Sequence, residues 1–286
     1  MTARRLCSIV VMIGFFAGLS ASAEQPGASP NYLALGDSVP FGYINQAGFE
    51  YVNAENFVSY ADWLSIGLTL SDVNAACPGE TTGSFLSTQA PDNGCRLYRA
   101  HAPLHVSYGS SPTQFAYATN FLQQNGNTAV VTIQLGSDDV FLLEQQCNND
   151  PQCIAAGLPQ VLTTAGTNMA TILAGLRATG YEGAIVIVNY YSTDYSNQSI
   201  TLITSELNQA IAASAHLFGA VVADVFSAFQ AATQQTGGRT CLAGLLNPKT
   251  GVNSLACDVH PSQSGHKLIA QVISGVIQPS KAKSGK

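Results

Sequence analysis

Short apolar runs alternate with segments of helical periodicity along most of this chain. The apolar runs are expected to be strands and lie at residues 32–38, 73–76, 128–135, 184–190 and 220–225. Helical patterns separate or follow them at residues 57–68, 112–124, 154–177, 201–217 and 262–277. Residues 84–111 are expected to form a long loop region. Because parallel neighbouring strands require crossover connections, the alternation predicts an α/β fold with a mostly parallel sheet.

Two of the predicted strands end in a similar way. The run from Tyr32 stops at Gly36-Asp37-Ser38, and the run from Thr128 stops at Gly136-Ser137-Asp138-Asp139. The carboxyl ends of parallel strands share one edge of a sheet, and open α/β sheets bind ligands just outside that edge. We therefore expect both polar segments to line one rim, although Gly36-Asp37-Ser38 alone is also an ordinary turn sequence.

The first residues of the chain have the pattern of an export signal. Arg4 and Arg5 precede an apolar run that ends at the small residues Ala21-Ser22-Ala23. This pattern predicts a secretory signal peptide at residues 1–23, cleaved near Ala23. The mature protein is therefore expected to be extracellular or periplasmic.

The mature chain is expected to contain one domain at residues 31–279, between a flexible leader at 24–30 and a disordered basic tail at 280–286. Loss of the two signal-peptide arginines lowers the formal net charge from −6 to −8, which disfavours nucleic acid as a partner. No later stretch approaches the roughly 20 apolar residues of a spanning helix, so stable membrane insertion is not expected. We expect a monomer.

Six cysteines follow the predicted signal peptide: Cys77, Cys95, Cys147, Cys153, Cys241 and Cys257. An even number in an exported chain favours disulfides, and six cysteines allow 15 connectivities. They fall into three groups of near neighbours, so we favour the sequential pairs 77–95, 147–153 and 241–257. Zinc binding is the alternative, but no C-x-x-C spacing occurs and export favours oxidation.

A serine hydroxyl needs a neighbouring base to become a nucleophile, and histidine is the usual base. The histidines of the chain are His101, His105, His216, His260 and His266. The first two lie in the predicted loop region, the third lies on a helix, and the last lies in the first turn of the final helix. His260 lies just before that helix, where loops from the strand ends converge. Ser38 and His260 are therefore the candidate nucleophile and base.

Four sequence blocks together resemble the SGNH/GDSL hydrolases, a family of esterases and lipases, along the whole mature chain. In order they are Gly36-Asp37-Ser38-Val39-Pro40-Phe41-Gly42, Asn74-Ala75-Ala76-Cys77-Pro78-Gly79-Glu80-Thr81-Thr82, Gly136-Ser137-Asp138-Asp139 and Asp258-Val259-His260-Pro261. The resemblance implies a flavodoxin-like three-layer α/β/α sandwich with a five-stranded sheet. It also implies that Ser38 is the nucleophile and His260 the base. The oxyanion hole would use the backbone N–H groups of Ser38 and Gly79 and a side chain of the third block. The cysteine pairs resemble those of secreted actinobacterial-type esterases in this family.

The third block departs from the family pattern Gly-x-Asn-Asp, because Asp138 stands where the family has an amide donor. An ionised carboxylate cannot donate a hydrogen bond. Loss of one oxyanion donor costs about 2.7–4 kcal/mol, and a charge about 4 Å from the oxyanion adds repulsion of about 4 kcal/mol at an effective dielectric near 20. A neutral Asp138, kept protonated by burial or by a neighbouring carboxylate, would still donate and would give an acid pH optimum.

The second departure from the family pattern concerns the acid that orients the catalytic histidine. The family spacing Asp-x-x-His points to position 257, which is Cys257, and Asp258 is one residue closer to the histidine. Some family members orient the imidazole with a backbone carbonyl. The carbonyl of residue 257 and the carboxylate of Asp258 are therefore equal alternatives for the group that orients His260.

These features favour a secreted serine esterase that acts on small-molecule or lipid esters through an acyl-serine intermediate and needs no cofactor. A binding protein that has lost its oxyanion hole is the first alternative, because of Asp138. A carbohydrate acetylesterase is the second, because the aromatic loop from Phe41 to Tyr51 can flank either a sugar or an acyl chain. A metal site is disfavoured, since no histidine-rich ligand spacing accompanies the acids Asp37, Asp138, Asp139 and Asp258.

Overall fold

A five-stranded parallel sheet forms the centre of the molecule. The computed structural model describes residues 29–45, 49–249 and 256–277, so the predicted signal peptide and basic tail lie outside the described residues. The strands are β1 (Asn31–Gly36), β2 (Ser71–Asn74), β3 (Thr128–Gln134), β4 (Ala184–Val188) and β5 (Ala220–Ala223). Their order is β2-β1-β3-β4-β5 and every neighbouring pair is parallel. The chain order reverses between β1 and β3, where this type of sheet binds ligands.

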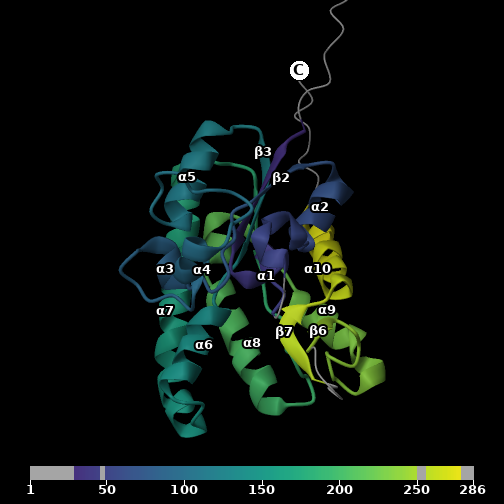
Figure 1. The fold of residues 1–286 in the computed structure, drawn as a ribbon. Coiled ribbons are helices and arrows are strands. Elements are labelled where there is room, and N and C mark those ends of the chain that lie inside the picture. The colour runs from purple at the N-terminus through teal and green to yellow at the C-terminus, as the bar shows by residue number, and fades with distance from the viewer. Residues whose placement is uncertain (1–28, 46–48, 250–255, 278–286) are drawn as a thin grey trace, which may run out of the picture.

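Helices cover both faces of this sheet, which confirms the α/β sandwich expected from the sequence (Figure 1). One layer contains α2 (Tyr60–Leu68), α9 (Val225–Ala232) and α10 (Gln263–Val276), and α10 packs against both of the others. The other contains α5 (Gln114–Gln124), α7 (Pro151–Ala178) and α8 (Gln198–Ala212), with α7 in contact with its two partners. Strand side chains such as Leu33, Ile133 and Ile187 are fully buried between the layers. Burial on both faces explains the continuous apolar runs.

Residues 84–111 are not one long loop, so this prediction is wrong. Two short helices occupy part of this segment: α3 (Thr82–Leu86), which begins two residues before it, and α4 (Cys95–His101). Thr81 and Ser84 cap the start of α3 reciprocally through their side chains and backbone N–H groups. Helices of one or two turns show no apolar periodicity, which explains why the sequence pattern missed them.

Several other elements differ from their predicted bounds. The helix expected at 112–124 begins at Gln114, because the Thr113 side chain accepts from the N–H of Ala116 and makes Thr113 the cap. The segment expected as a helix at 201–217 ends as α8 at Ala212 and continues as a 3-10 turn, η3 (Ala215–Phe218). The other 3-10 turns are η1 (Phe49–Val52), η2 (Ala54–Asn56) and η4 (Gln234–Thr236).

Elements that the sequence pattern did not indicate lie around the carboxyl edge of the sheet. They include α1 (Ser38–Phe41), α6 (Ser137–Gln146) and the strands β6 (Leu246–Pro248) and β7 (Cys257–Pro261), and the helix α9 after β5 was not indicated either. The last two form a separate antiparallel pair. His260 therefore lies on a strand and not in a loop before the last helix.

The three disulfides are the predicted sequential pairs, Cys77–Cys95, Cys147–Cys153 and Cys241–Cys257. The first and third tie segments that flank the carboxyl edge of the sheet, since Cys77 follows β2 and Cys257 begins β7. Within the described ranges, no helix has the length and apolar character needed to cross a membrane.

Candidate active site

Ser38 is presented at the carboxyl edge of β1 by a sharp change of backbone direction at Gly36. This glycine has φ +139°, and a Cβ atom there would lie 2.1 Å from the backbone oxygen of Gln134 on the neighbouring strand. No other residue fits so close an approach. Asp37 then caps α1 by accepting from the N–H of Val39 at 2.9 Å, so Ser38 becomes the first residue of that helix.

Ser38, His260 and Asp258 form a continuous hydrogen-bonded series. Nε2 of His260 lies 2.9 Å from Oγ of Ser38, and Nδ1 lies 2.6 Å from Oδ1 of Asp258. With Nδ1 protonated and donating to Asp258, Nε2 is left as the acceptor for the serine proton. The carboxylate of Asp258, and not the carbonyl of residue 257, therefore faces the imidazole.

The carboxylate of Asp258 is held in its ionised form. Burial acts to raise its pKa, but hydrogen bonds from the ring and backbone of His260 and from the N–H of Asn45 outweigh burial and bring the pKa below its ordinary value. The contact with Asn45 occupies the second oxygen, Oδ2, at 3.1 Å. Both oxygens are thus satisfied, as a buried carboxylate requires.

The strand that carries His260 is fixed from two further directions. The hydroxyl of Tyr191 donates to the carbonyl of Val259 at 2.7 Å. The ring of Tyr43 lies with its centroid 5.0 Å from that of the imidazole. These contacts, together with the β6–β7 pairing and the Cys241–Cys257 disulfide, limit the positions that the histidine can take.

Gly79 lies in a tight turn after β2. Pro78 and Gly79 occupy the central positions of the turn, which is closed by a hydrogen bond from the N–H of Glu80 to the carbonyl of Cys77 at 3.1 Å. Gly79 has φ +85°, and a Cβ atom there would lie 2.5 Å from the carbonyl oxygen of Asn93. A Pro-Gly pair suits a turn that needs positive φ at its third residue. Ser38 and Gly79 line one cavity, as the predicted oxyanion hole requires.

Asp138 lies at the start of α6 and is only 4% exposed. Oδ1 accepts a hydrogen bond from Nδ2 of Asn93 at 2.7 Å, while Oδ2 has no hydrogen-bond partner among the described residues. Burial, followed by the charge of Asp37, raises the pKa of Asp138 well above its ordinary value. Asp138 is among the residues that line the cavity containing Ser38 and Gly79, but its Oδ2 atom is itself fully buried.

Asp37, which follows β1, is hydrogen-bonded to residues of α6 and of the segment after β4. Its Oδ2 accepts from the hydroxyl of Tyr190, which follows β4, and from Oγ of Ser137 at 3.0 Å. Burial raises the pKa of Asp37 to about 6 despite these hydrogen bonds. Asp37 and Asp138 are therefore two buried carboxyls, and ionisation of Asp37 disfavours ionisation of Asp138.

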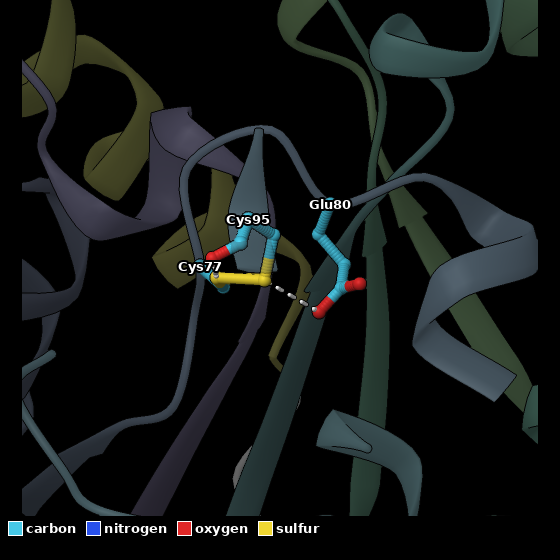
Figure 2. Close-up of side chains that lie close together, drawn as sticks. All are labelled: Cys77, Glu80 and Cys95. Carbon is cyan, nitrogen blue, oxygen red and sulfur yellow. Dashed lines mark hydrogen bonds between the residues drawn. A yellow bond between two sulfur atoms is a disulfide. The ribbon is translucent and has the colours of Figure 1, made fainter. Parts of the chain in front are cut away.

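Glu80 is buried next to the Cys77–Cys95 disulfide, as Figure 2 shows. Its Oε2 accepts from Nε2 of Gln114 at 3.2 Å and lies 3.5 Å from Sγ of Cys95. Burial raises the pKa of Glu80 to about 7. The ligand atoms of Cys77, Glu80 and Cys95 lie within 4.8 Å of one another, but both sulfurs are in a disulfide and offer no thiolate to a metal.

Two cavities meet at Ser38 and His260. The first, called the apolar cavity, has a volume of about 290 Å³ and is lined by Val140, Phe141, Ile203, Leu207 and Tyr191, among others. The second, called the tyrosine cavity, has a volume of about 640 Å³ and is lined by Tyr43, Tyr51, Tyr98, Gly79, Asn93 and Asp138, among others. The aromatic loop singled out in the sequence thus contributes two tyrosines to the second cavity.

Among the described residues, no histidine other than His260 is hydrogen-bonded to Ser38. His105 contacts the carbonyl of Phe41 at 3.0 Å, and His101 lines the tyrosine cavity. His266 is buried, and burial lowers its pKa to about 3. His216 lies in η3.

A three-layer α/β fold with a Ser–His–Asp series at the carboxyl edge of a parallel sheet is an arrangement typical of hydrolases. The chain belongs to the GDSL-like lipase/acylhydrolase family, whose model matches residues 34–268. A search of curated protein sequences gave no match.

Solved structures of similar fold have low sequence identity to this chain. A phospholipase A1 from Streptomyces albidoflavus is 18% identical, with a TM-score of 0.58 and coverage of 87% of this chain and 99% of the other. Axe2, an acetylxylan esterase from Geobacillus stearothermophilus, is 14% identical, with a TM-score of 0.52 and coverage of 91% and 99%. These likenesses confirm the SGNH hydrolase fold.

The structure also brings to the site residues that the sequence did not indicate. Tyr190 follows β4 at the carboxyl edge, a position that the strand-end rule already favours for site residues. Asn93 comes from a turn between α3 and α4, and no motif marks it. Gln114 binds the N–H and carbonyl of Gly36 at 2.7 and 3.0 Å and so fixes the end of β1.

Proposed function

We propose that this protein hydrolyses carboxylic esters through an acyl intermediate on Ser38. The observation that carries the proposal is the series Ser38 Oγ, His260 and Asp258, with contacts of 2.9 and 2.6 Å. Nε2 of His260 takes the serine proton as Oγ attacks the ester carbonyl. Asp258 stabilises the imidazolium that forms.

The rest of the cycle follows from the same groups. The backbone N–H groups of Ser38 and Gly79 stabilise the negative charge on the former carbonyl oxygen. The imidazolium gives its proton to the departing alcohol, which leaves an acyl-serine. His260 then takes a proton from water, whose oxygen attacks the acyl carbon. The imidazolium returns that proton to Oγ of Ser38 as the bond between Oγ and the acyl carbon breaks, which releases the acid and restores the free serine.

The two cavities divide the substrate between them. The apolar cavity suits an acyl chain, because its aliphatic and aromatic lining gains from burying methylene groups. The tyrosine cavity suits the alcohol part, because tyrosine hydroxyls next to aromatic faces accommodate polar groups. A small-molecule or lipid ester of modest acyl length satisfies both.

A carbohydrate acetylesterase is the second candidate. Three tyrosines, Tyr43, Tyr51 and Tyr98, line the cavity on the alcohol side, and aromatic faces of this kind stack on sugars. The comparison of kcat/KM for an acetylated xylooligosaccharide with that for an aryl acetate and a longer-chain aryl ester separates the two candidates.

Export and monomeric state are further proposals. The three disulfides support export, since such bonds persist in oxidising compartments. N-terminal sequencing of the protein from the growth medium of a secreting host is expected to begin after Ala23. Light scattering is expected to give the mass of one chain.

Hydrolysis of aryl esters from acetyl to decanoyl, measured between pH 4 and 9, tests the proposed function. Wild type is expected to turn over the short esters, and Ser38→Ala is expected to lose at least about 10³-fold in kcat. Equal rates for both proteins, or binding of esters with no turnover at any pH, would contradict the proposal. The second result would instead favour a binding protein.

A further inference from the structure

One acidic side chain lines the apolar cavity. Among the described residues that line this cavity, Glu144 of α6 is the only carboxylate, and none is a lysine or an arginine. Glu144 is half-buried. Burial raises its pKa, and neither a hydrogen bond nor a neighbouring charge among the described residues contributes to the shift. The chain therefore offers this carboxylate no partner of opposite charge within the cavity.

Glu144 lies at the end of the cavity that is far from Ser38. Ser137, Val140 and Glu144 all line the cavity, and their spacing along α6 places them on one face of the helix. Ser137 is at the inner end, because its Oγ donates to Oδ2 of Asp37, the residue before the nucleophile. The seven positions from 137 to 144 correspond to a rise of about 10 Å along the helix axis.

The opposite wall of the cavity is α8, which has its inner end at Leu207. The Cδ1 atom of Leu207 lies 3.1 Å from the Cβ position of Gly136, at the end of β3. Ile200 lines the same cavity near the start of α8 and is 36% exposed. In Figure 1, α6 and α8 both extend below α1, which marks the carboxyl edge of β1. The cavity therefore runs outward from Ser38, and Glu144 and Ile200 lie at its solvent-facing end.

An acyl chain that is bound to Ser38 and follows this cavity meets Glu144. A chain of roughly seven atoms and one hydrogen bond cover about 10 Å. Along this distance the chain gains from the burial of methylene groups. At its end, a methyl group would remove water from an unpaired carboxylate, which is unfavourable, whereas an ammonium group would donate a charge-assisted hydrogen bond to it. A second carboxylate would be repelled.

We propose that Glu144 forms a subsite for a positively charged group at the far end of the acyl chain. The preferred acyl group is then an ω-amino acyl chain of roughly six carbons, a length set by the rise along α6. The inference rests on the proposed ester hydrolysis and names the acyl class that the same site selects. Glu144 does not touch the reacting atoms, and it determines specificity through its charge.

Three aryl esters of matched chain length test the subsite. They carry 6-aminohexanoyl, heptanoyl and 6-carboxyhexanoyl groups, which end in an ammonium, a methyl and a carboxylate. At pH 8, with the rate without enzyme subtracted, wild type is expected to have a kcat/KM for the amino ester about 10²-fold above that for the carboxy ester. This ratio combines about 10-fold from attraction and about 10-fold from repulsion. The amino ester is also expected to match or exceed the heptanoyl ester.

Glu144→Gln keeps the size of the side chain and removes its charge. We expect the ratio of kcat/KM between the amino and carboxy esters to fall at least about 10-fold in this variant. Glu144→Leu is expected to raise kcat/KM for the heptanoyl ester about 4-fold, because the chain then ends against an apolar side chain. Molar salt is expected to lower the ratio of wild type and to change that of Glu144→Gln less.

Glu206→Gln is the matched control. Glu206 lies on α8, and it is not among the residues that line the apolar cavity. Its substitution removes the same charge from the molecule, so it separates the effect of net charge from that of a charge within the cavity. We expect Glu206→Gln to keep the wild-type ratio between the amino and carboxy esters.

Binding without turnover gives a second readout. Calorimetric titration of Ser38→Ala with the amino ester is expected to give a Kd about 10-fold lower than titration of Ser38→Ala/Glu144→Gln. Both proteins are expected to bind the heptanoyl ester with Kd values within a few-fold of each other. A change confined to the charged ester is what a subsite for charge predicts, whereas a loss of packing at Glu144 would weaken both esters equally.

Three results would overturn the inference. They are an equal ratio in wild type and Glu144→Gln, an equal fall of the ratio in Glu206→Gln, and hydrolysis of aryl acetate by wild type with none of the amino ester. Failure of the proposed function is distinguishable, because wild type would then hydrolyse none of the esters and Ser38 would not react with a fluorophosphonate. Labelling of Ser38 and hydrolysis of the acetate, together with any of the three results, sinks the inference alone.

Discussion

Asp258 and His260 lie two residues apart on β7, and Oδ1 of Asp258 contacts both the backbone N–H and Nδ1 of His260, at 2.8 and 2.6 Å. Side chains at positions i and i+2 of a strand lie on the same face. An extended backbone therefore allows the spacing Asp-x-His to place the carboxylate against the imidazole, which the spacing Asp-x-x-His does elsewhere in the family. In the structure the carboxylate of Asp258 orients the ring, in place of the carbonyl of residue 257.

Asp258→Asn tests this arrangement. The amide of asparagine allows the wrong tautomer of His260 and removes the charge that stabilises the imidazolium, so kcat is expected to fall about 10³-fold or more. Measurement of kcat at saturating aryl acetate, with circular dichroism to confirm the fold, checks the prediction. A loss of less than about 10-fold would show that Asp258 is dispensable.

Gly79→Ala is expected to impair the oxyanion hole. A Cβ atom at φ +85° and 2.5 Å from the carbonyl of Asn93 forces the turn to move, which shifts the N–H that faces the oxyanion. We expect kcat to fall about 10²-fold with a small change in KM. Gly67→Ala on α2 is the control, because a Cβ there meets nothing within 4 Å and is expected to leave kcat unchanged. Equal kcat in both variants would contradict the placement of Gly79.

The apolar cavity is expected to set the preference for acyl chain length. Each buried methylene contributes about 0.8 kcal/mol, so kcat/KM is expected to rise about 4-fold per methylene until the cavity is full. Ile203→Phe fills part of the cavity and is expected to move the preferred ester to a shorter chain while acetate hydrolysis remains. Ile66→Phe, at a position 72% exposed on α2, is the matched control. Chain-length profiles that coincide for all three proteins would place the acyl chain elsewhere.

Buried carboxyls are expected to make the fold more stable in mild acid than at neutral or higher pH. Burial raises the pKa of Glu80 from 4.5 to about 7, so its neutral form stabilises the fold fully below pH 4.5, and this contribution of about 3 kcal/mol is lost as the pH rises to about 7. Asp72, with a pKa of about 7, and Asp37, with a pKa of about 6, act in the same direction. His266 opposes them, because its lowered pKa of about 3 costs stability below pH 6.5.

Urea unfolding at pH 5 and pH 8 checks this balance. Wild type is expected to have the higher free energy of unfolding at pH 5, and Glu80→Gln, which is neutral at both pH values, is expected to show a smaller difference between them. An equal difference in the two proteins would mean that Glu80 is ionised in the fold at pH 5.

The parallel sheet follows from features visible in the sequence. Runs such as Ala184–Val188 are apolar at every position because both faces of the strand are covered, and their alternation with helices allows little besides a parallel sheet. Ser38 and His260 were predictable because one follows a strand and the other precedes the last helix. The four motif blocks strengthened that prediction through the family resemblance.

The contacts that decide the chemistry were not predictable from the chain pattern. Asn93 comes to Asp138 through a turn whose position depends on the Cys77–Cys95 disulfide and on the close approach to Gly79. Among the described residues β7 pairs with β6 alone, and a strand of five residues is too short to give a periodic signal in the sequence. The relation between Asp258 and His260 depends on that strand.

Intact-mass analysis after treatment with a fluorophosphonate at pH 5 and at pH 7 tests the central claim most directly, namely that His260 activates Ser38 as a nucleophile. The folded wild-type protein is expected to gain the mass of one adduct, mapped by peptide analysis to Ser38, and Ser38→Ala and His260→Ala are expected to gain none. No adduct on the wild type at either pH, or an adduct that persists in Ser38→Ala, would contradict the claim.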